Sequence, residues 1–170
     1  MKFEYNFLIR YILIFIPVKL ITYLMTPITI YGVYLLLKNY NPGLSGINLT
    51  INNISFTFIE ACISSYAYYL LLFLVLTTKD ISFVKRVYTL LIGFLLVLVM
   101  NYIRIVGLII GTIKFGFDWF NTVHLLIWAL FSWVYVFLVW IFLIKVFKIK
   151  SIPLYDDFKY LYKRSLFKKN

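Results

Sequence analysis

Cysteine, histidine and acidic residues are scarce in this sequence of 170 residues. It has one cysteine, Cys62, and one histidine, His124, and only 6 Asp and Glu stand against 17 Lys and Arg. A single cysteine excludes an internal disulfide, so its thiol is either an inert packing group or a reactive one. The shortage of negative charge indicates membrane topology first and contact with nucleic acid only second.

Apolar residues, in contrast, dominate the composition. They make up 64% of the chain, aromatic residues make up 21%, and the mean hydropathy is +0.94. An ordinary soluble domain is only about half apolar, and a fold of this length has too little interior to bury the surplus. The composition therefore predicts an all-α integral membrane protein with a single domain.

Four long apolar stretches are expected to cross the membrane as helices. They are residues 6–25, 61–78, 87–111 and 124–144. The first has no small-residue cleavage site, which favours an anchor over a removable signal peptide. Residues 1–150 are thus expected to form one transmembrane domain, and residues 151–170 a basic cytoplasmic tail that includes a short interfacial helix.

Two stretches between the first and second spans have a different pattern. Thr26 and Pro27 are typical of an N-cap and a first helical residue. The helix that they open would reach only roughly 21 Å before the Asn-Pro-Gly sequence that closes it, which predicts an interfacial helix. In residues 46–59, apolar and polar residues alternate on both sides of Asn52 and Asn53. This alternation predicts a small β-hairpin on the outer membrane surface.

The positions of the positive charges predict the orientation of the chain. Most Lys and Arg fall in the N-terminal segment, in the loop 77–86 and in the tail. Only Lys38 and Lys114 are left for the loops on the opposite side. Because cations are retained on the cytoplasmic side, both termini are expected to be cytoplasmic, in a multi-pass protein of the plasma membrane.

Polar residues in the last three spans fall at one depth. Counted from the cytoplasmic ends of their helices, Cys62, Arg104 and His124 lie roughly 24, 26 and 30 Å into the membrane. That level is the outer boundary of the hydrocarbon, with Glu60 just above it and Asn101 one turn below Arg104. Each residue alone has an ordinary structural explanation. Together they indicate a site, because charge in a membrane is costly and is retained mainly where it is paired or functional.

The side chains at this depth have the chemistry of a thiol nucleophile and its partners. Cys62 is expected in the first turn of its helix, where the helix dipole favours a thiolate, and His124 can take the thiol proton and later return it to a leaving amine. Arg104 can hold the substrate carbonyl or the oxyanion that forms on it. Asn101 is expected to orient Arg104. Glu60, which disfavours a thiolate, is expected to turn aside and pair with a cation.

These residues resemble the archaeosortase/exosortase family of membrane transpeptidases. The matching motifs are EAC at 60–62, NYIRI at 101–105 and His124 at the start of the last span, and with the hairpin they cover roughly residues 45–135. The resemblance implies that Cys62 is the nucleophile and that Arg104 and His124 complete the site. The family usually has glycine where this chain has Ser64, and the compact build is most similar to its short archaeal branch.

The resemblance also implies substrates and an acceptor. The expected substrates are exported proteins with a C-terminal motif, a transmembrane helix and a basic cluster. They would be cleaved at the extracytoplasmic face through a thioester, and the new C-terminus would pass to an acceptor, expected to be a lipid. This chemistry requires no cofactor and no metal. Gly107 and Gly111 give the third span a face that permits close approach of another helix.

Other functions fit parts of the sequence less well. A non-catalytic membrane subunit or transporter component is the main alternative, but transporters tend to place ionisable groups near the midplane and in paired repeats, and this sequence has no internal repeat. A metal site of Cys62, His124 and Glu60 is disfavoured because Arg104 would repel a cation. Nucleic-acid binding by the tail ranks lowest, since its charges suit anionic lipid headgroups.

Overall fold

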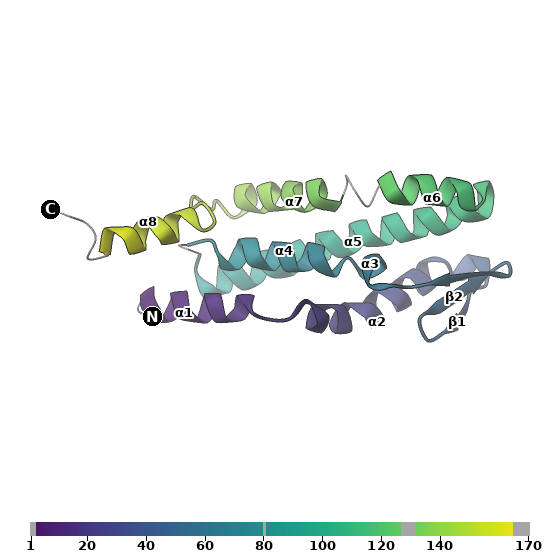
Figure 1. Cartoon of the computed structure of the whole chain (residues 1–170), viewed down its shortest axis with the longest axis horizontal. Helices are drawn as coiled ribbons and strands as arrows, with labels where there is room; N and C mark the ends of the chain where they lie inside the picture. The colour runs from purple at the N-terminus through teal and green to yellow at the C-terminus, as the bar shows by residue number, and fades with distance from the viewer. Residues whose placement is uncertain (1–2, 80, 127–131, 165–170) are drawn as a thin grey trace.

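The structure of the protein is a computed structural model that describes residues 3–79, 81–126 and 132–164. The molecule is elongated, and its helices run mostly along the long axis (Figure 1). Both described ends of the chain lie at one end of this rod, and a three-stranded sheet lies at the other. The prediction of a mostly helical chain with a small β-structure is confirmed.

Two helices, α1 (Phe3–Ile14) and α2 (Val18–Leu36), form the N-terminal arm. The chain bends between them at Pro17, which has an extended backbone with ψ 137° and lacks an N–H donor. The predicted span 6–25 is therefore wrong in its limits, because it runs straight across this bend.

A helix start at Thr26 and Pro27, as the sequence predicts, is also wrong. α2 continues through both residues, and the Thr26 hydroxyl donates to the Thr22 carbonyl at 2.7 Å within the helix. Ile21 and Thr29 are buried on either side of Pro27, so packing against neighbouring helices outweighs the missing N–H. The predicted interfacial helix is thus the second half of α2.

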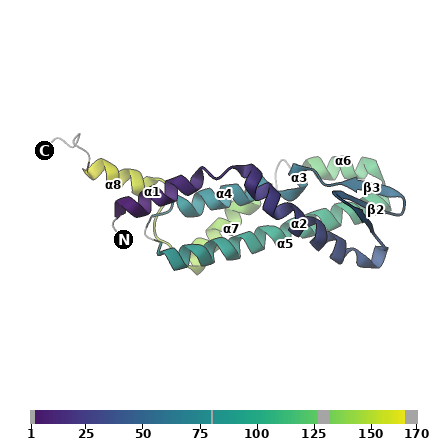
Figure 2. The same ribbon diagram turned by 90° about the horizontal axis from the view of Figure 1, so that it is seen from below.

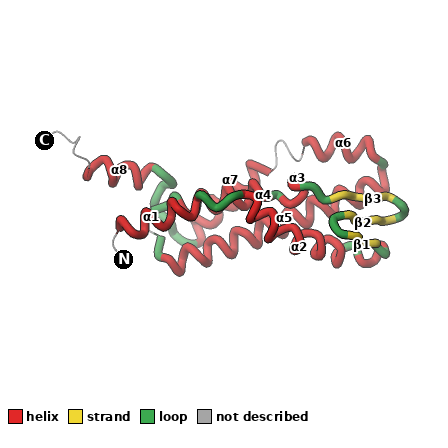
Figure 3. Tube along the Cα trace, turned by 60° about the horizontal axis from the view of Figure 1, so that its bottom comes forward, coloured by secondary structure: helices red, strands yellow, loops and turns green. Residues whose placement is uncertain are grey.

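A β-hairpin follows, as predicted. β2 (Asn48–Ile51) and β3 (Ile54–Thr57) pair antiparallel, and Asn52 and Asn53 connect them with φ of 49° and 64°. Two positive φ values in a two-residue loop make a type I′ turn, whose twist matches that of the strands. A third strand that was not predicted, β1 (Gly43–Ser45), pairs with the other edge of β2 (Figure 3).

The sheet closes the end of the rod that lies away from the termini. A single 3₁₀ turn, Lys38–Tyr40, connects α2 to it. Leu49 and Ile51 on β2 are fully buried in a cluster with Val33 on α2 and with residues of α5 (Phe83–Phe115). The sheet therefore packs on the far ends of α2 and α5 (Figure 2).

The predicted span 61–78 contains a break. Its helix is divided into a single turn, α3 (Glu60–Ile63), and a longer helix, α4 (Ser65–Leu76). α4 lies at the centre of the bundle, where it packs against α1, α2, α5 and α7 (Ser132–Val146). Its sequence is apolar on nearly all sides, as expected of a helix enclosed by others.

α5 is the longest element and exceeds the predicted span 87–111 at both ends. Its 33 residues extend roughly 50 Å, against about 30 Å for a hydrocarbon core. Exposed apolar side chains follow one side of it every three or four residues: Val84, Tyr88, Leu91, Leu95, Val99 and Ile103. This stripe is roughly 29 Å long, so its length matches the hydrocarbon, and it ends one residue before Arg104.

The predicted span 124–144 does not begin at His124. The chain turns back at Gly116, whose φ of 86° favours glycine, and enters α6 (Phe117–Leu126). His124 therefore lies in the last turn of α6. Residues 127–131, through which the predicted span would continue, lie outside the described residues, and α7 follows them.

Two helices, α2 and α5, are long and apolar enough to cross a membrane. α4 and α7 are apolar but shorter, with 12 and 15 residues. Large hydrophobic side chains are exposed on α1, α2, α5 and α7. A surface of this kind suits lipid rather than water as its solvent, and it favours association of the protein with a membrane.

At the end of the rod that holds the termini, α8 (Tyr155–Arg164) is joined to the bundle by a buried ion pair that the sequence does not predict. Arg10 donates to Asp157 at 3.0 Å, with only 3% and 1% of the two side chains exposed. The Thr78 carbonyl accepts hydrogen bonds from Arg10 at 3.1 Å and from Arg86 at 2.9 Å. Arg10 and Arg86, whose positive charges the sequence suggests only as signals of membrane topology, thus connect the ends of helices.

Candidate functional site

The cysteine lies in the single turn of α3, directly after the sheet. Cys62 is half-buried, and its N–H donates to the Ile59 carbonyl at 2.9 Å. The prediction that it occupies the first turn of a long helix is wrong, because the helix breaks two residues later. A single turn has only a small dipole, so any stabilisation of a thiolate must come from neighbouring groups.

The break occurs at Ser64, which has a left-handed backbone with φ 60° and ψ 32°. A residue other than glycine in this region costs roughly 1–2 kcal/mol. The serine hydroxyl donates to Oδ1 of Asn101 at 2.9 Å, which offsets part of that cost. The break is thus fixed by a side chain of α5.

Asn101 uses both ends of its amide on the segment around the cysteine. It is buried, it accepts the Ser64 hydroxyl, and its Nδ2 donates to the Cys62 carbonyl at 2.9 Å. The sequence predicts that Asn101 orients Arg104. The structure instead shows that it orients the peptide group of Cys62.

Arg104, one turn farther along α5, binds the same segment. Its Nη2 donates to the carbonyls of Ala61 and Cys62 at 3.0 and 3.2 Å. Its Nε is buried and has no hydrogen-bond partner among the described residues. One nitrogen of the guanidinium therefore braces α3, while another has no acceptor in the described part of the chain.

Glu60 begins α3 and is exposed. The predicted ion pair with a nearby cation is not formed, since Glu60 takes part in no salt bridge in the described part of the chain. Its carboxylate therefore stays at the surface, on the same turn as the cysteine.

The histidine approaches from α6, outside the helices that can span a membrane. His124 is partly buried and stacks on Phe120, with the two ring centroids 5.1 Å apart and the planes 9° apart. Burial, and to a smaller extent the positive charge of Arg104, lowers the pKa of His124 from its ordinary value. The imidazole is thus neutral at pH 7 and able to accept a proton. No hydrogen bond joins it to the Cys62 thiol among the described contacts.

The position of α6 depends on one small residue of α5. The ring of Trp119 lies against Gly111 so closely that a side chain there would collide with it. Gly107, predicted to share a packing face with Gly111, has no such neighbour within 4 Å. Of these two glycines, therefore, only Gly111 mediates a close helix contact.

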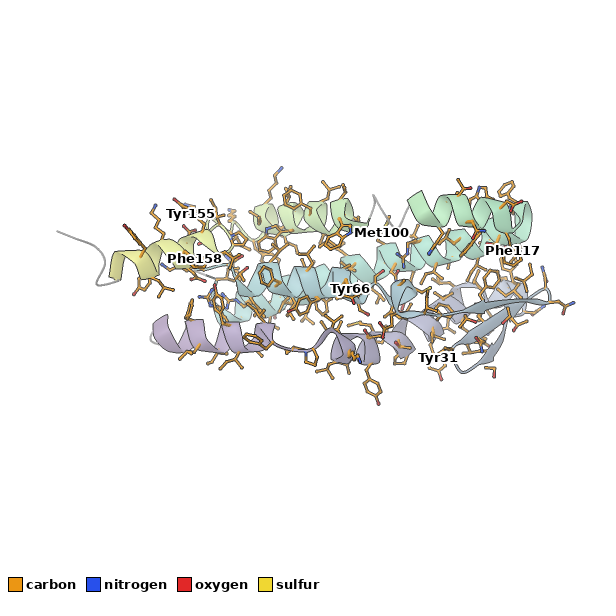
Figure 4. All side chains as sticks on the ribbon, in the orientation of Figure 1. Tyr31, Tyr66, Met100, Phe117, Tyr155 and Phe158 are labelled. Carbon is orange, nitrogen blue, oxygen red and sulfur yellow. The ribbon has the colours of Figure 1, made fainter. Side chains whose placement is uncertain are left out.

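A cavity of about 100 Å³ lies beside the cysteine segment. Residues of the α3–α4 segment line it together with Arg104 and two residues of α7. The described lining residues are Glu60, Ala61, Ser64, Ser65, Tyr66, Ala67, Leu70, Arg104, Trp133 and Val136. Cys62 and His124 are not among them, although Ala61 directly precedes the cysteine. The sequence does not identify the residues of α4 and α7 that line this cavity, because apolar and aromatic side chains in a membrane span carry no chemical signal. One of them, Tyr66 of α4, is labelled in Figure 4.

Of the five predicted site residues, four lie on α3 and α5 close to one another, and the fifth, His124, lies on α6. Hydrogen bonds connect Cys62, Asn101 and Arg104, and Glu60 shares the turn of Cys62. No described hydrogen bond joins His124 to this set; burial, and less strongly the charge of Arg104, lowers the pKa of its imidazole. No group of three His, Cys, Asp or Glu side chains suited to a metal gathers among the residues described.

Comparisons of the chain with protein-family models, curated proteins and solved structures give no significant match.

Proposed function

We propose that the protein is a membrane-embedded cysteine transpeptidase or protease that acts at the outer boundary of the bilayer. The observation that supports this most is the convergence of Asn101 and Arg104 on the main-chain carbonyl of Cys62. Two polar side chains at the end of a lipid-facing stripe are costly unless they work. The motifs around all three residues are also similar to those of the archaeosortase/exosortase family.

The proposed topology has four crossings of the membrane. The chain would cross outward through α1 and α2, return through α3 and α4, cross outward again in α5, turn back outside the membrane in α6, and return through α7. This order agrees with termini and sheet at opposite ends of the rod (Figure 1). The basic end would face the cytoplasm of a plasma-membrane protein and the sheet would face outside.

In the first proposed step, the Cys62 sulfur attacks the carbonyl carbon of the scissile peptide, and the thiol proton passes to His124. Negative charge develops on the carbonyl oxygen, where the unpartnered Nε of Arg104 can donate a hydrogen bond. The C–N bond then breaks, His124 returns the proton to the leaving amine, and the substrate remains bound to Cys62 as a thioester.

In the second step, a hydroxyl or amine of an acceptor attacks the thioester and gives its proton to His124. The C–S bond breaks and the cysteine recovers its proton. With a lipid as acceptor the reaction is a transpeptidation, and with water it is a hydrolysis. The proposed substrates are exported proteins whose C-terminal motif lies just outside a transmembrane helix, because this places the scissile bond at the depth of Arg104.

A second candidate function is that of a non-catalytic membrane subunit. The observation that favours it is that Nη2 of Arg104 and Nδ2 of Asn101 both donate to backbone carbonyls, as purely structural side chains do. In that case Cys62 would be an ordinary, half-buried thiol.

Thiol reactivity distinguishes the two functions. The purified protein would be treated with a small thiol-reactive reagent between pH 5 and pH 9, and labelling would be followed by intact mass. The matched control is Cys62→Ser combined with Ser55→Cys, which places an ordinary thiol on the exposed face of β3. An enzyme should label faster than this control at pH 7, and His124→Ala should slow it. If Cys62 is labelled no faster than the control thiol, and His124→Ala does not change the rate, the result favours a non-catalytic membrane subunit over an enzyme.

A further inference from the structure

The sheet at the far end of the rod has an open edge that leads to the cysteine segment. Its strands lie in the order β1-β2-β3, and in the described part of the chain β3 pairs only with β2 (Figure 3). After β3 the backbone stays extended at Ile59, with φ −99° and ψ 169°, and then enters the turn of Cys62. A further chain laid along the outer edge of β3 would therefore be led toward the thiol.

The register of the ladder shows which peptide groups lie on this edge. β2 and β3 are joined by a two-residue turn, so Ile54, the first residue after it, exchanges hydrogen bonds with β2, and every second residue that follows also faces β2. The N–H of Phe58 donates to the Ile47 carbonyl at 2.9 Å, in agreement with this alternation. The peptide groups of Ser55 and Thr57 consequently point away from β2, and they have no hydrogen-bond partner among the described residues.

This edge lacks the features by which proteins usually block a free strand. Edge strands are commonly protected by charged side chains, by proline or by being very short. At the opposite edge of the sheet, β1 has only three residues and directly follows Pro42. β3, in contrast, consists of four uncharged residues without proline, and Ser55 and Thr57 are exposed. The unprotected edge is thus the one that leads to Cys62, and such an edge is a template for another strand.

We propose that the outer edge of β3 binds the substrate as an additional strand, so that main-chain hydrogen bonds align the peptide with Cys62. The occupant is the extended segment of an exported protein just outside its transmembrane helix, an assignment that rests on the proposed function. The N–H and C=O groups of this segment pair with those of Ser55 and Thr57. From Ser55 to Glu60 an extended chain covers roughly 17 Å, which about five substrate residues would fill.

The direction of the added strand follows from the path of β3. The strand runs from the hairpin turn at the end of the rod toward α3 (Figure 1). In the proposed topology this path leads from outside to the boundary of the membrane. A substrate that enters the membrane from outside runs the same way, so it pairs with β3 in parallel. Figure 3 shows α6 on the side of the sheet where β3 lies, so the bound chain runs on the side of the helix that carries His124.

The first test measures binding without any reaction. The detergent-purified full-length protein would be mixed with a peptide amide of alternating threonine and valine, five residues long, or with the same peptide methylated on its backbone nitrogens. Pairing depends on main-chain groups, so only the unmethylated peptide should slow hydrogen–deuterium exchange at the outward amides of Ser55 and Thr57. The two peptides have the same side chains, which makes the methylated one the matched control.

The second test measures whether pairing delivers the peptide to the thiol. The same two peptides, each with a C-terminal chloromethyl ketone, would alkylate Cys62, followed by intact mass. The wild type should react about tenfold faster with the unmethylated peptide. Ser55→Pro removes an outward N–H without removing a bond to β2 and should abolish this preference, whereas Ser55→Ala keeps the N–H and should retain it.

The outcomes separate this edge from the reaction at Cys62. If the unmethylated peptide protects the two amides but Cys62 is no more reactive than an ordinary thiol, strand pairing is supported and the proposed reaction fails. If Cys62 is reactive but neither peptide protects the amides and both alkylate at the same rate, the proposed reaction stands and the pairing is overturned. Amides that are protected without peptide, and exposed again on dilution, would assign the edge to a second copy of the chain and would also overturn the proposal.

Discussion

The amide of Asn101 donates from Nδ2 to the main-chain carbonyl of Cys62 at 2.9 Å and accepts the Ser64 hydroxyl on Oδ1 at 2.9 Å. Cys62 of α3, Ser64 between α3 and α4, and Asn101 of α5 thus share a continuous set of hydrogen bonds around a left-handed turn. The backbone that presents the only thiol therefore depends on a residue far away in the sequence.

Replacing Asn101 with alanine should destabilise the protein by about 1–3 kcal/mol. The change removes both hydrogen bonds and leaves the half-buried Ser64 hydroxyl without its acceptor. Thermal unfolding in detergent measures the loss. Asn121→Ala, at an exposed position of α6, is the control and should stay within about 0.5 kcal/mol of the wild type. Equal losses in the two variants would show that Asn101 has no special role.

Two substitutions of Ser64 separate backbone strain from hydrogen bonding. Ser64→Ala loses the hydrogen bond to Asn101 and keeps the strain of φ 60°, whereas Ser64→Gly loses the same bond and relieves the strain. The glycine variant should therefore be more stable than the alanine variant by about 1 kcal/mol in the same unfolding measurement. A more stable alanine variant would mean that Ser64 does not adopt the left-handed conformation.

Local signals account for the parts of the fold that the sequence predicts. The hairpin follows from alternation over a few residues and from two asparagines that tolerate positive φ. The breaks in the helices are different. Pro27 is the stronger local signal and yet lies inside α2, while the helix breaks at Pro17. Packing against other helices determines which of the two prolines interrupts the helix, and the sequence near each proline does not reveal that packing.

The candidate site shows the same limit. Polar residues in apolar spans identified Cys62, Asn101 and Arg104 correctly as neighbours, since depth along a helix can be counted. The helix break at Ser64 was missed because serine carries no signal for it. The position of His124 was misjudged because Gly116 turns the chain back, although a glycine between two aromatic residues offered a sign of the turn.

The contact of Trp119 with Gly111 should control the position of His124. Gly111→Leu forces the indole away and shifts α6, so a processing activity should fall on the order of a hundredfold, because a misplacement of about 1 Å has that effect. Gly107→Leu, which enters open space, is the matched control and should retain activity. The rate of substrate processing by membranes that contain each variant is the measurement. Equal activities would separate α6 from the reaction.

A single histidine makes the acid–base prediction direct. Burial and the charge of Arg104 lower the pKa of His124, so its protonation midpoint should lie below the ordinary 6.5. A lowered pKa keeps the ring neutral at pH 7, and activity that needs the neutral ring should decline only as the pH falls through that lower midpoint. The imidazole carbon-bound proton signal, followed by NMR against pH, gives the midpoint for one residue. Arg104→Gln should move it upward, and a midpoint at or above 6.5 in the wild type would contradict the prediction.

The buried pair of Arg10 and Asp157 should be the most sensitive point outside the candidate site. Asp157→Asn leaves a guanidinium that is 3% exposed without its counter-charge, which should cost about 3–5 kcal/mol. Arg10→Met should cost at least as much, because it also removes a donor from the carbonyls of Leu76 and Thr78. Asp156→Asn is the control, since an amide oxygen can still accept the N–H that this side chain binds. If Asp157→Asn and Asp156→Asn unfold at the same temperature, α8 is not held by the ion pair, and its place at the end of the bundle must depend on its apolar contacts instead.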